Sequence, residues 1–383
     1  MTRPNLIFIV ADDLGYADLG CYGGRTAAFG AVSPVLDGLA ARGLRFTQGY
    51  ANSPVCSPTR FALMTGRYPY RLRGAGYRSA LIGKWHLGFA PHFGPMSGGV
   101  DYFTHCDSSG RHDLWQSDAE HWQEGYLTDL LSDHAVRYVQ TAPQDQPFFI
   151  SLHYTAPHWP WETREDAARA PAIKDKLFDL ASVNIHSCRR MIHHMDEGIG
   201  RVMAALQARG VDYNTLVVFT SDNGGERFSD NWPLVGGGKM DLTEGGIRVP
   251  WIAHWPALIQ PGGVSAQQCL TMDWSATMLA AAGVAADAAY PLDGVSLLPV
   301  LRDAAQHFHR PLHWRMKHRS QRALRDGDWK YLRVDGHDYL FKSPPTNASA
   351  PTRPRTRPPA WPRCAPTGNA GTPACRQFPM RPS

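Results

Sequence analysis

A cysteine in the segment 56–60 (CSPTR) has neighbours that suit a reaction with an anion. Pro58 favours the first turn of a helix, where it loses no hydrogen bond, and the apolar run 61–64 continues that helix. We therefore expect Cys56 at or just before a helix amino terminus, where free N–H groups and the helix dipole attract anions. Arg60 adds a bidentate donor, so a nucleophile at Cys56 would face an oxyanion. The alternative is a buried free cysteine with a packing role.

Four residues with oxygen-bearing side chains follow two apolar runs, 6–11 and 216–220. They are Asp12, Asp13, Asp222 and Asn223. If both runs are buried parallel strands, these side chains lie at the strands' carboxyl ends, where open α/β sheets bind ligands. Their oxygens are ligands that Ca²⁺ and Mg²⁺ prefer, and clustered carboxylates without a cation would repel one another. The alternative is a capping or turn role, which is common for Asp and Asn.

Further apolar runs predict the elements that must position these residues. Strands are predicted at residues 44–46, 80–82 and 147–154, and helices at 35–40 and 181–209. Strand, polar cluster and helix follow one another repeatedly along the chain. We therefore expect an α/β fold with a mixed, largely parallel sheet that helices flank on both faces.

The carboxyl-terminal part of the chain has a different character. Residues 306–342 predict a small β unit, with a hairpin whose turn lies at Asp326-Gly327. Residues 343–383 contain eleven prolines and six arginines but no acidic residue, a composition typical of a disordered tail. The predicted organisation is a main domain at 1–305, a β subdomain at 306–342 and a tail at 343–383.

Composition limits the classes of protein and partner that are expected. With 383 residues and 43% hydrophobic content, the chain can form a full core. The net charge of +5 is supplied by the tail, so it gives no argument for nucleic-acid binding. Seven scattered cysteines without metal or disulfide spacing are expected to be mostly reduced thiols. No signal peptide or membrane span is evident, so we expect a cytoplasmic protein without membrane contact, or a periplasmic one if the start is misassigned.

Seven sequence blocks stand out along the chain, namely residues 9–16 (IVADDLGY), 56–60 (CSPTR), 65–69 (TGRYP), 83–88 (GKWHLG), 156–158 (APH), 220–225 (TSDNGG), and 238–239 (GK) ahead of 244–250 (EGGIRVP). These blocks resemble those of type I, formylglycine-dependent sulfatases of the alkaline-phosphatase superfamily, and they occur in that family's order. A single motif of this size matches by chance, but seven in order rarely do. The resemblance covers roughly residues 4–341. It implies hydrolysis of sulfate esters on an alkaline-phosphatase-like α/β fold.

The resemblance also implies a metal site and a modified cysteine. In that family the cysteine is oxidised to formylglycine by a formylglycine-generating enzyme, so Cys56 would be both nucleophile and ligand. The implied metal ligands are Asp12, Asp13, Cys56, Asp222 and Asn223. The number of carboxylates favours Ca²⁺ over Mg²⁺. A thiolate suits such a hard ion poorly, whereas a hydrated aldehyde offers one hydroxyl that can bind the metal and attack sulfur.

The remaining catalytic roles also follow from the resemblance. His86 would be the base that returns the aldehyde, and Arg60 and Lys84 would bridge formylglycine and sulfate oxygens. His158 and Lys239 would contact the sulfate and the leaving oxygen as general acid and electrostatic stabiliser. His153 lies near these blocks and receives no catalytic role. The expected substrate is a sulfated small molecule or sugar, and the leaving alcohol is not indicated.

Two departures from the family pattern keep alternatives open. Only residues 70–75 join two blocks between which relatives carry a helix, which predicts that a helix covering the sheet is missing. The match ends at 339–341, and a reading-frame shift near residue 342 would account for the Pro/Arg-rich tail. The alternatives are a phosphonate monoester or phosphodiester hydrolase on the same scaffold, or an inactive truncated paralogue.

Overall fold

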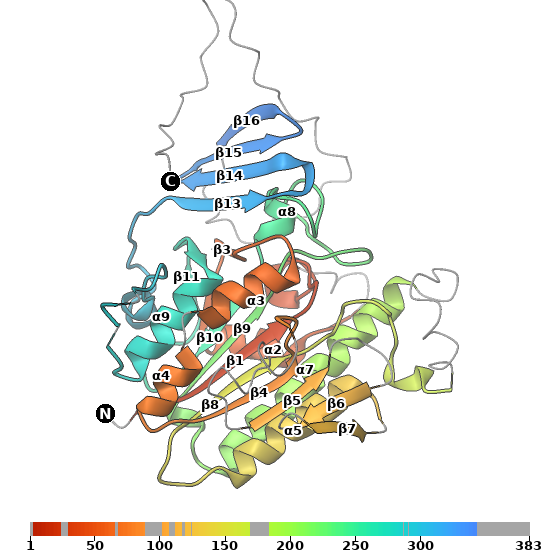
Figure 1. Ribbon diagram of the computed structural model, residues 1–383, viewed down its shortest axis with the longest axis vertical. Helices are drawn as coiled ribbons and strands as arrows, with labels where there is room; N and C mark the ends of the chain where they lie inside the picture. Colours follow the sequence, from red (N-terminus) through yellow and green to blue (C-terminus); the bar gives the residue numbers. More distant parts are fainter. Residues whose placement is uncertain are drawn as a thin grey trace, which may run out of the picture. The chain divides into compact units, whose positions relative to one another are not determined.

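A central β-sheet organises the chain in its computed structural model (Figure 1), which describes residues 3–23, 30–65, 68–88, 102–106, 112–116, 119–123, 125–168, 184–285, 287–289 and 291–342. The apolar run near the amino terminus forms strand β1 (Asn5–Ala11) in the middle of this sheet. Its parallel neighbours are β8 (Phe148–His153) and β9 (Thr215–Ser221). All three strands are buried almost throughout, as expected where both faces of a sheet are covered.

The sheet has ten strands in the order β11-β2-β10-β9-β1-β8-β4-β5-β6-β7. The run β9-β1-β8-β4-β5 is parallel, whereas β10, β6 and β7 run antiparallel to their neighbours. The predicted mixed, largely parallel sheet is therefore confirmed. The other strands are β2 (Leu44–Phe46), β4 (Arg78–Lys84), β5 (Tyr102–Cys106), β6 (His112–Gln116), β7 (Ala119–Gln123), β10 (Trp251–His254) and β11 (Gly263–Ser265), and a separate pair joins β3 (Gly49–Tyr50) to β12 (Cys269–Leu270).

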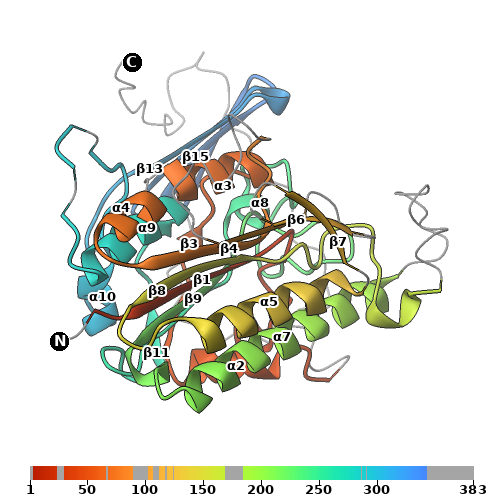
Figure 2. The ribbon, with the colours of Figure 1, turned by 60° about the horizontal axis from the view of Figure 1, so that its bottom comes forward.

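Helices cover both faces of the sheet, and Figure 2 shows α2, α5 and α7 on one face and α3, α4 and α9 on the other. Side chains alternate between the two faces along β1, so Ile7 and Ile9 pack in the core that includes residues of α2, α5 and α7. Leu6 and Phe8 pack in the core that includes residues of α3, α4 and α9. The helices are α2 (Pro34–Ala41), α3 (Cys56–Thr65), α4 (Tyr68–Gly74), α5 (Leu127–Thr141), α7 (Ile185–Ala208), α8 (Glu244–Ile247), α9 (Thr271–Ala281) and α10 (Leu298–Arg302), with short 3₁₀ turns η1 (Gly20–Tyr22), η3 (Arg164–Asp166) and η4 (Asp212–Asn214). None of the helices in the described ranges is both long and apolar enough to cross a membrane.

Helix α4 corrects one expectation from the sequence. The short bridge at residues 70–75 was expected to leave no helix, yet α4 occupies most of it and runs almost directly into β4. Leu72 of α4 is buried in the core that also holds Leu63 of α3. Seven residues make two helical turns, which is enough to place one apolar side chain over the sheet. The prediction of a missing helix is therefore wrong.

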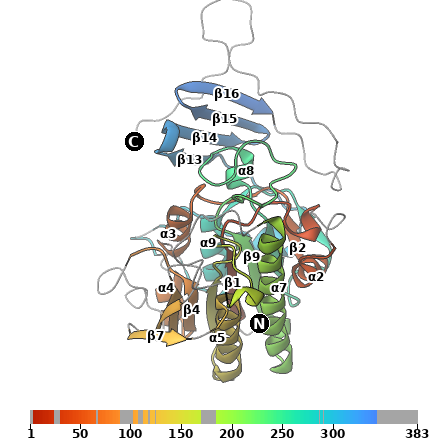
Figure 3. The same ribbon diagram turned by 90° about the vertical axis from the view of Figure 1, so that its right-hand side faces the viewer.

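The small carboxyl-terminal sheet is an antiparallel meander of four strands (Figure 3). Its strands are β13 (Leu312–Met316), β14 (Gln321–Asp326), β15 (Trp329–Val334) and β16 (His337–Lys342), with η5 (His318–Ser320) between the first two. The expected hairpin is β14–β15, but its two loop residues are Gly327 and Asp328, because Asp326 pairs with Trp329. Gly327 has a φ of 52°, which glycine adopts without strain.

The chain divides into two compact units, residues 1–308 and 309–383, whereas the sequence placed the boundary after residue 305. The predicted tail at 343–383 lies outside the described residues. Four cysteines with described side chains are free thiols, namely Cys21, Cys56, Cys188 and Cys269.

Candidate active site

The acidic residues predicted to bind a metal leave the sheet at adjacent positions. Ala11 at the end of β1 pairs in register with Ser221 at the end of β9. The Asp13 N–H donates to Asp222 Oδ1 at 3.3 Å, and the Leu14 N–H donates to Ser221 Oγ at 3.0 Å. The carboxyl ends of two parallel strands thus bring Asp12 and Asp13 together with Asp222 and Asn223, at the edge where open α/β sheets bind ligands.

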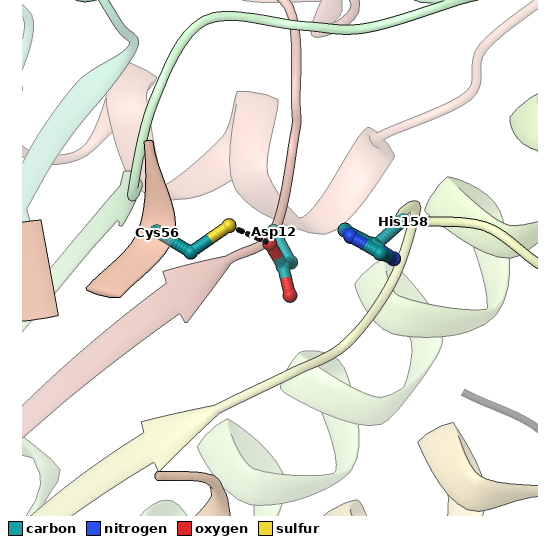
Figure 4. A group of neighbouring side chains, drawn as sticks. All are labelled: Asp12, Cys56 and His158. Carbon is teal, nitrogen blue, oxygen red and sulfur yellow. Dashed lines mark hydrogen bonds between the residues drawn. The ribbon is translucent and has the colours of Figure 1, made fainter. Parts of the chain in front are cut away.

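Cys56 is the first residue of helix α3, where the sequence predicted it. Its Sγ lies 3.3 Å from Asp12 Oδ1, and Figure 4 shows the Asp12 carboxylate between Cys56 and His158. The loop before the helix is held by Thr59, whose hydroxyl accepts from the Ser53 N–H and donates to the Ser53 carbonyl, both at 3.0 Å. The start of α3 therefore fixes the thiol beside the end of β1.

Four potential ligand atoms lie close enough together to share one ion. They lie within 4.8 Å of one another and belong to Asp12, Asp13, Cys56 and Asp222. Asn223 Nδ2 donates to Asp13 Oδ1 at 2.7 Å, whereas Asn223 Oδ1 is buried without a hydrogen-bond partner. An unsatisfied buried oxygen costs about 1–3 kcal/mol, and a cation in this cluster would satisfy it. The carboxylate and amide oxygens fit a hard ion such as Ca²⁺ or Mg²⁺.

The three carboxylates of the cluster are buried and repel one another. Burial, followed by the charge of Asp12, raises the pKa of Asp222 to about 7 and also raises the pKa of Asp13. Asp12 behaves differently, because Lys84 and the other nearby cations outweigh the effect of burial and hold its pKa well below the usual range. The cluster therefore depends on positive charge close by.

Two lysines pair with two of these carboxylates. Lys84 Nζ lies 2.5 Å from Asp12 Oδ2, and Lys239 Nζ lies 2.7 Å from Asp13 Oδ2. Lys84 ends strand β4, whereas Lys239 lies in a loop that is tied to the Cys56 loop, because the N–H of the following residue donates to the Pro54 carbonyl at 2.9 Å. The two ammonium groups thus reach the cluster from separate parts of the chain.

Arg60 is buried and held on two sides. Its Nε and Nη2 donate to Asp222 Oδ2 at 3.2 and 2.8 Å, and its Nη1 donates to the Lys84 carbonyl and lies 3.1 Å from His153 Nδ1. His153 is fully buried at the end of β8, with Nε2 2.7 Å from Ser151 Oγ. Burial, then the charge of Arg60, lowers the pKa of His153 to about 3, so the ring is neutral at pH 7. The sequence assigned His153 no role, although its place near the end of the predicted strand at 147–154 was a usable signal.

The two histidines predicted to be catalytic differ in their surroundings. His158 Nε2 lies 3.6 Å from Asp13 Oδ2, and its Nδ1 lies 2.6 Å from the Trp159 carbonyl, which assigns a hydrogen to Nδ1. His86 follows β4, is exposed and has a φ of 57°. Such a φ is unusual for a residue other than glycine and occurs preferentially at functional sites. Among the predicted residues, His158 thus lies with the carboxylates, whereas His86 faces solvent.

The profile of the Sulfatase family matches residues 4–284 of this chain. The match includes every predicted site residue and all ten strands of the central sheet. This chain therefore belongs to the sulfatase family.

Individual relatives extend this finding. Human N-acetylgalactosamine-6-sulfatase is 31% identical over an alignment of 359 positions that covers 78% of this chain and 66% of that protein. The Escherichia coli (strain K12) protein named Uncharacterized sulfatase YdeN is 30% identical over an alignment of 390 positions that covers 82% of this chain and 68% of that protein. The chain thus spans about two thirds of the length of these curated relatives.

Solved structures share the fold. Ps i-CgsB matches with a TM-score of 0.78 and 30% identity, over 89% of this chain and 86% of that one. The same protein has been solved in complex with k-i-k-neocarrahexaose. The PsFucS1 sulfatase from Pseudoalteromonas sp. matches with a TM-score of 0.74 and 25% identity, over 89% and 84% of the two chains. The expected alkaline-phosphatase-like α/β fold is confirmed by this similarity.

Proposed function

We propose that this protein hydrolyses sulfate esters with a formylglycine derived from Cys56 as nucleophile and a divalent cation beside it. One observation carries the proposal. Cys56 is the first residue of a helix, its Sγ lies within 4.8 Å of an oxygen of each of three carboxylates, and basic side chains contact these carboxylates. A nucleophile, a hard-cation site and anion-binding groups are the parts that sulfate transfer needs. Membership of the sulfatase family supports the same reaction.

The cation would be held by Asp12, Asp13, Asp222 and Asn223, with the modified Cys56 as a further ligand. When bound, it would supply positive charge that offsets the carboxylates and polarises oxygen atoms next to it. The unsatisfied Asn223 Oδ1 and the raised pKa values of Asp13 and Asp222 support a cation at this place. The carboxylate-rich donor set favours Ca²⁺ over Mg²⁺.

The unmodified Cys56 thiol would be a poor nucleophile. Burial, followed by the charges of Asp12 and Asp222, raises the pKa of this thiol far above its ordinary value, so the sulfur stays protonated. A formylglycine-generating enzyme, the proposed partner, would replace the thiol with an aldehyde. The hydrate of that aldehyde has one hydroxyl that can attack sulfur and a second that can lose its proton, so that the C–O bond to sulfate breaks and the aldehyde returns.

The basic residues would bind the sulfate and assist both steps. Arg60, Lys84 and Lys239 balance the three carboxylates in charge, so a bound divalent cation would leave this group with excess positive charge for sulfate oxygens. His158 would donate a proton to the leaving oxygen. His86 would accept the proton of the second hydroxyl, and its exposed position would let it pass that proton to solvent.

A sulfated sugar is the proposed class of substrate. The name of the human relative specifies a sulfated amino sugar, and Ps i-CgsB was solved with k-i-k-neocarrahexaose. The two proteins are similar to this chain to nearly the same degree, with 31% and 30% sequence identity. We therefore expect sugar sulfates to be better substrates than simple aryl sulfates.

A comparison of two esters with the same leaving group tests the reaction type. Protein co-expressed with a formylglycine-generating enzyme should hydrolyse an aryl sulfate with a higher kcat/KM than the matched aryl phosphonate monoester. Cys56→Ala should abolish turnover, and Cys21→Ala, which removes another free thiol, should retain it. A higher kcat/KM for the phosphonate would replace the proposal with a phosphonate monoester hydrolase.

A further inference from the structure

The small carboxyl-terminal sheet carries a cleft, and none of the residues assigned to the proposed reaction is among its described lining residues. Its volume is about 820 Å³, and those of its lining residues that the structure describes belong to residues 315–336. Four of them are cationic, namely Arg315, Lys317, Arg322 and Arg333, and none of the described residues that line it is acidic. A cleft of this size can hold a ligand of several rings.

Three of these cations form a row across neighbouring strands. Arg315 of β13 lies opposite Arg322 of β14, which in turn lies opposite Arg333 of β15. All three side chains are exposed on the same face of the sheet. Adjacent strands lie about 4.8 Å apart, so the row spans roughly 10 Å. Like charges placed directly opposite each other destabilise a sheet, so the fold alone gives no reason for this arrangement.

Little negative charge offsets the row. Arg315, Lys317 and Arg322 form no ion pair with any residue in the described ranges, and Arg333 has only a long contact of 3.9 Å with Asp338. Residues 309–342 hold nine lysines and arginines against four aspartates, whereas residues 1–308 hold 24 basic and 30 acidic residues. Within residues 1–342, the excess of positive charge is therefore concentrated on this small sheet, where it can attract an anion.

Aromatic side chains lie on the same face as the arginine row. Tyr331 and Trp329 precede Arg333 by two and four residues along β15, so all three point to one side of the sheet. Trp329 is 45% exposed. Guanidinium groups bind pairs of oxygens of carboxylate and phosphate-like oxyanions bidentately, and exposed rings can stack on apolar sugar faces.

We propose that this arginine row, Arg315–Arg322–Arg333, on the small sheet of the second unit, binds a sulfated polysaccharide chain. The choice of a sulfated sugar rests on the proposed function, since the polymer would then be the substrate or its product. A single-stranded nucleic acid offers similar charge and rings, and it is treated as an outcome of the test. A bound chain would raise the local concentration of sulfate esters around the enzyme.

Binding is tested on full-length Cys56→Ala protein, which cannot turn the ligand over. The probes are dextran sulfate, unsulfated dextran of equal length, and single-stranded DNA of matched charge, each titrated by calorimetry at fixed salt. The row variant is Arg315→Gln/Arg322→Gln/Arg333→Gln. The matched control, Arg42→Gln/Arg137→Gln/Arg302→Gln, removes three exposed arginines from the first unit.

The row variant should bind dextran sulfate about tenfold or more weakly, with a shallower salt dependence, and the control variant should bind as before. Unsulfated dextran should not bind. The row variant should melt at the same or a higher temperature, because repulsion between like charges is removed. If the row variant melts at a lower temperature, binding of dextran sulfate is measured on the single variants Arg315→Gln and Arg322→Gln instead. Each single variant should bind severalfold more weakly than the wild type.

Equal losses in the row and control variants, or no loss in either, would overturn the proposal. So would DNA that binds as tightly as dextran sulfate and depends equally on the row, since the site would then be a general polyanion site. The test is independent of catalysis. With Cys56 present, the row variant should hydrolyse a small aryl sulfate at the wild-type rate. If neither the wild type nor this variant hydrolysed it, the result would count against the proposed function and not against this site.

Discussion

Arg60 shows how single residues hold the candidate active site together. Its guanidinium is buried between Asp222, the Lys84 carbonyl and a neutral His153. A buried arginine without such partners would be strongly destabilising, because its desolvation would not be offset. The three contacts fix the plane of the guanidinium and leave it positioned beside the cysteine at the start of α3.

His153 should make stability depend on pH. Its pKa is lowered to about 3 in the folded protein, while an unfolded histidine titrates near 6.5. Between these values the unfolded chain binds the extra proton, so stability is lost as the pH falls below about 6.5, by up to about 1.4 kcal/mol per pH unit. His153→Gln should therefore flatten the fall in unfolding free energy between pH 6.5 and 5, measured by denaturant titration.

The exposed His313 supplies the control for this prediction. His313→Gln makes the same replacement at an exposed position, so the slope measured for His153→Gln is compared with the slope of this variant. An unchanged slope in His153→Gln would mean that His153 is not buried as a neutral ring in solution.

Asp13 should link stability to the cation. It has a φ of 63°, a conformation that asparagine also tolerates, so Asp13→Asn keeps the backbone and removes one charge. Without cation the variant should be as stable as the wild type or more stable, because burial and Asp12 disfavour the charged form. Calcium at about one hundred times its Kd should stabilise the wild type by about 2.7 kcal/mol, and the variant by much less. Thermal melts with Ca²⁺, Mg²⁺ and chelator measure both effects.

Asp133→Asn, on the exposed side of α5, is the matched control and should keep the full calcium shift. An Asp13→Asn protein that gains as much from calcium as the wild type would contradict the assignment of Asp13 as a ligand.

At the scale of elements, the contact between helices α5 and α7 depends on a glycine. A Cβ on Gly198 of α7 would collide with the Ser132 side chain of α5 and crowd the Tyr154 hydroxyl. Alanine is the better helix former by about 1 kcal/mol, but this collision should outweigh that gain. Gly198→Ala should therefore lower the unfolding free energy by about 1–3 kcal/mol in denaturant titration.

Gly38 in α2 provides the opposite case within the same protein. The nearest atoms to its added Cβ belong to the flexible end of Arg42, at 3.2 Å, so they can move away. Gly38→Ala should be neutral or stabilise by up to about 1 kcal/mol. If both alanine variants gained stability alike, close packing of α5 on α7 would not explain Gly198.

Elements with a strong local signal could be predicted from the sequence. The apolar runs before Asp12 and Asp222 became β1 and β9, because a strand buried on both faces needs apolar side chains throughout. The predicted helix at 181–209 became α7, although residues 181–183 lie outside the described ranges. Helix α4 and the edge strands β5–β7 were not predicted, since their formation depends on pairing and packing with distant segments.

The candidate site was predictable to the extent that it follows from strand ends. Parallel strands bring their carboxyl ends to one edge, so Asp12 and Asp222 could be expected together. The contact of Arg60 with Asp222 and His153 could not be expected, because it requires the order of β9, β1, β8 and β4 in the sheet as well as the position of α3.

At the scale of the whole molecule, charge and chemistry are divided between the two units. The candidate active site belongs to the unit of residues 1–308, in which acidic residues outnumber basic ones. The described part of the second unit is strongly basic and carries the arginine row. Catalysis and capture of a sulfated polymer would thus reside in separate parts of one chain and can be tested separately.

The central claim is that a modified Cys56 performs the reaction, and the most direct test relates activity to that modification. Preparations with different amounts of formylglycine-generating enzyme are assayed on one aryl sulfate, while peptide mass spectrometry measures the fraction of Cys56 present as aldehyde. The account predicts that turnover per protein rises in proportion to the aldehyde fraction and extrapolates to zero when every Cys56 is a thiol. Turnover that persists at zero aldehyde, or does not change with the aldehyde fraction, would contradict it.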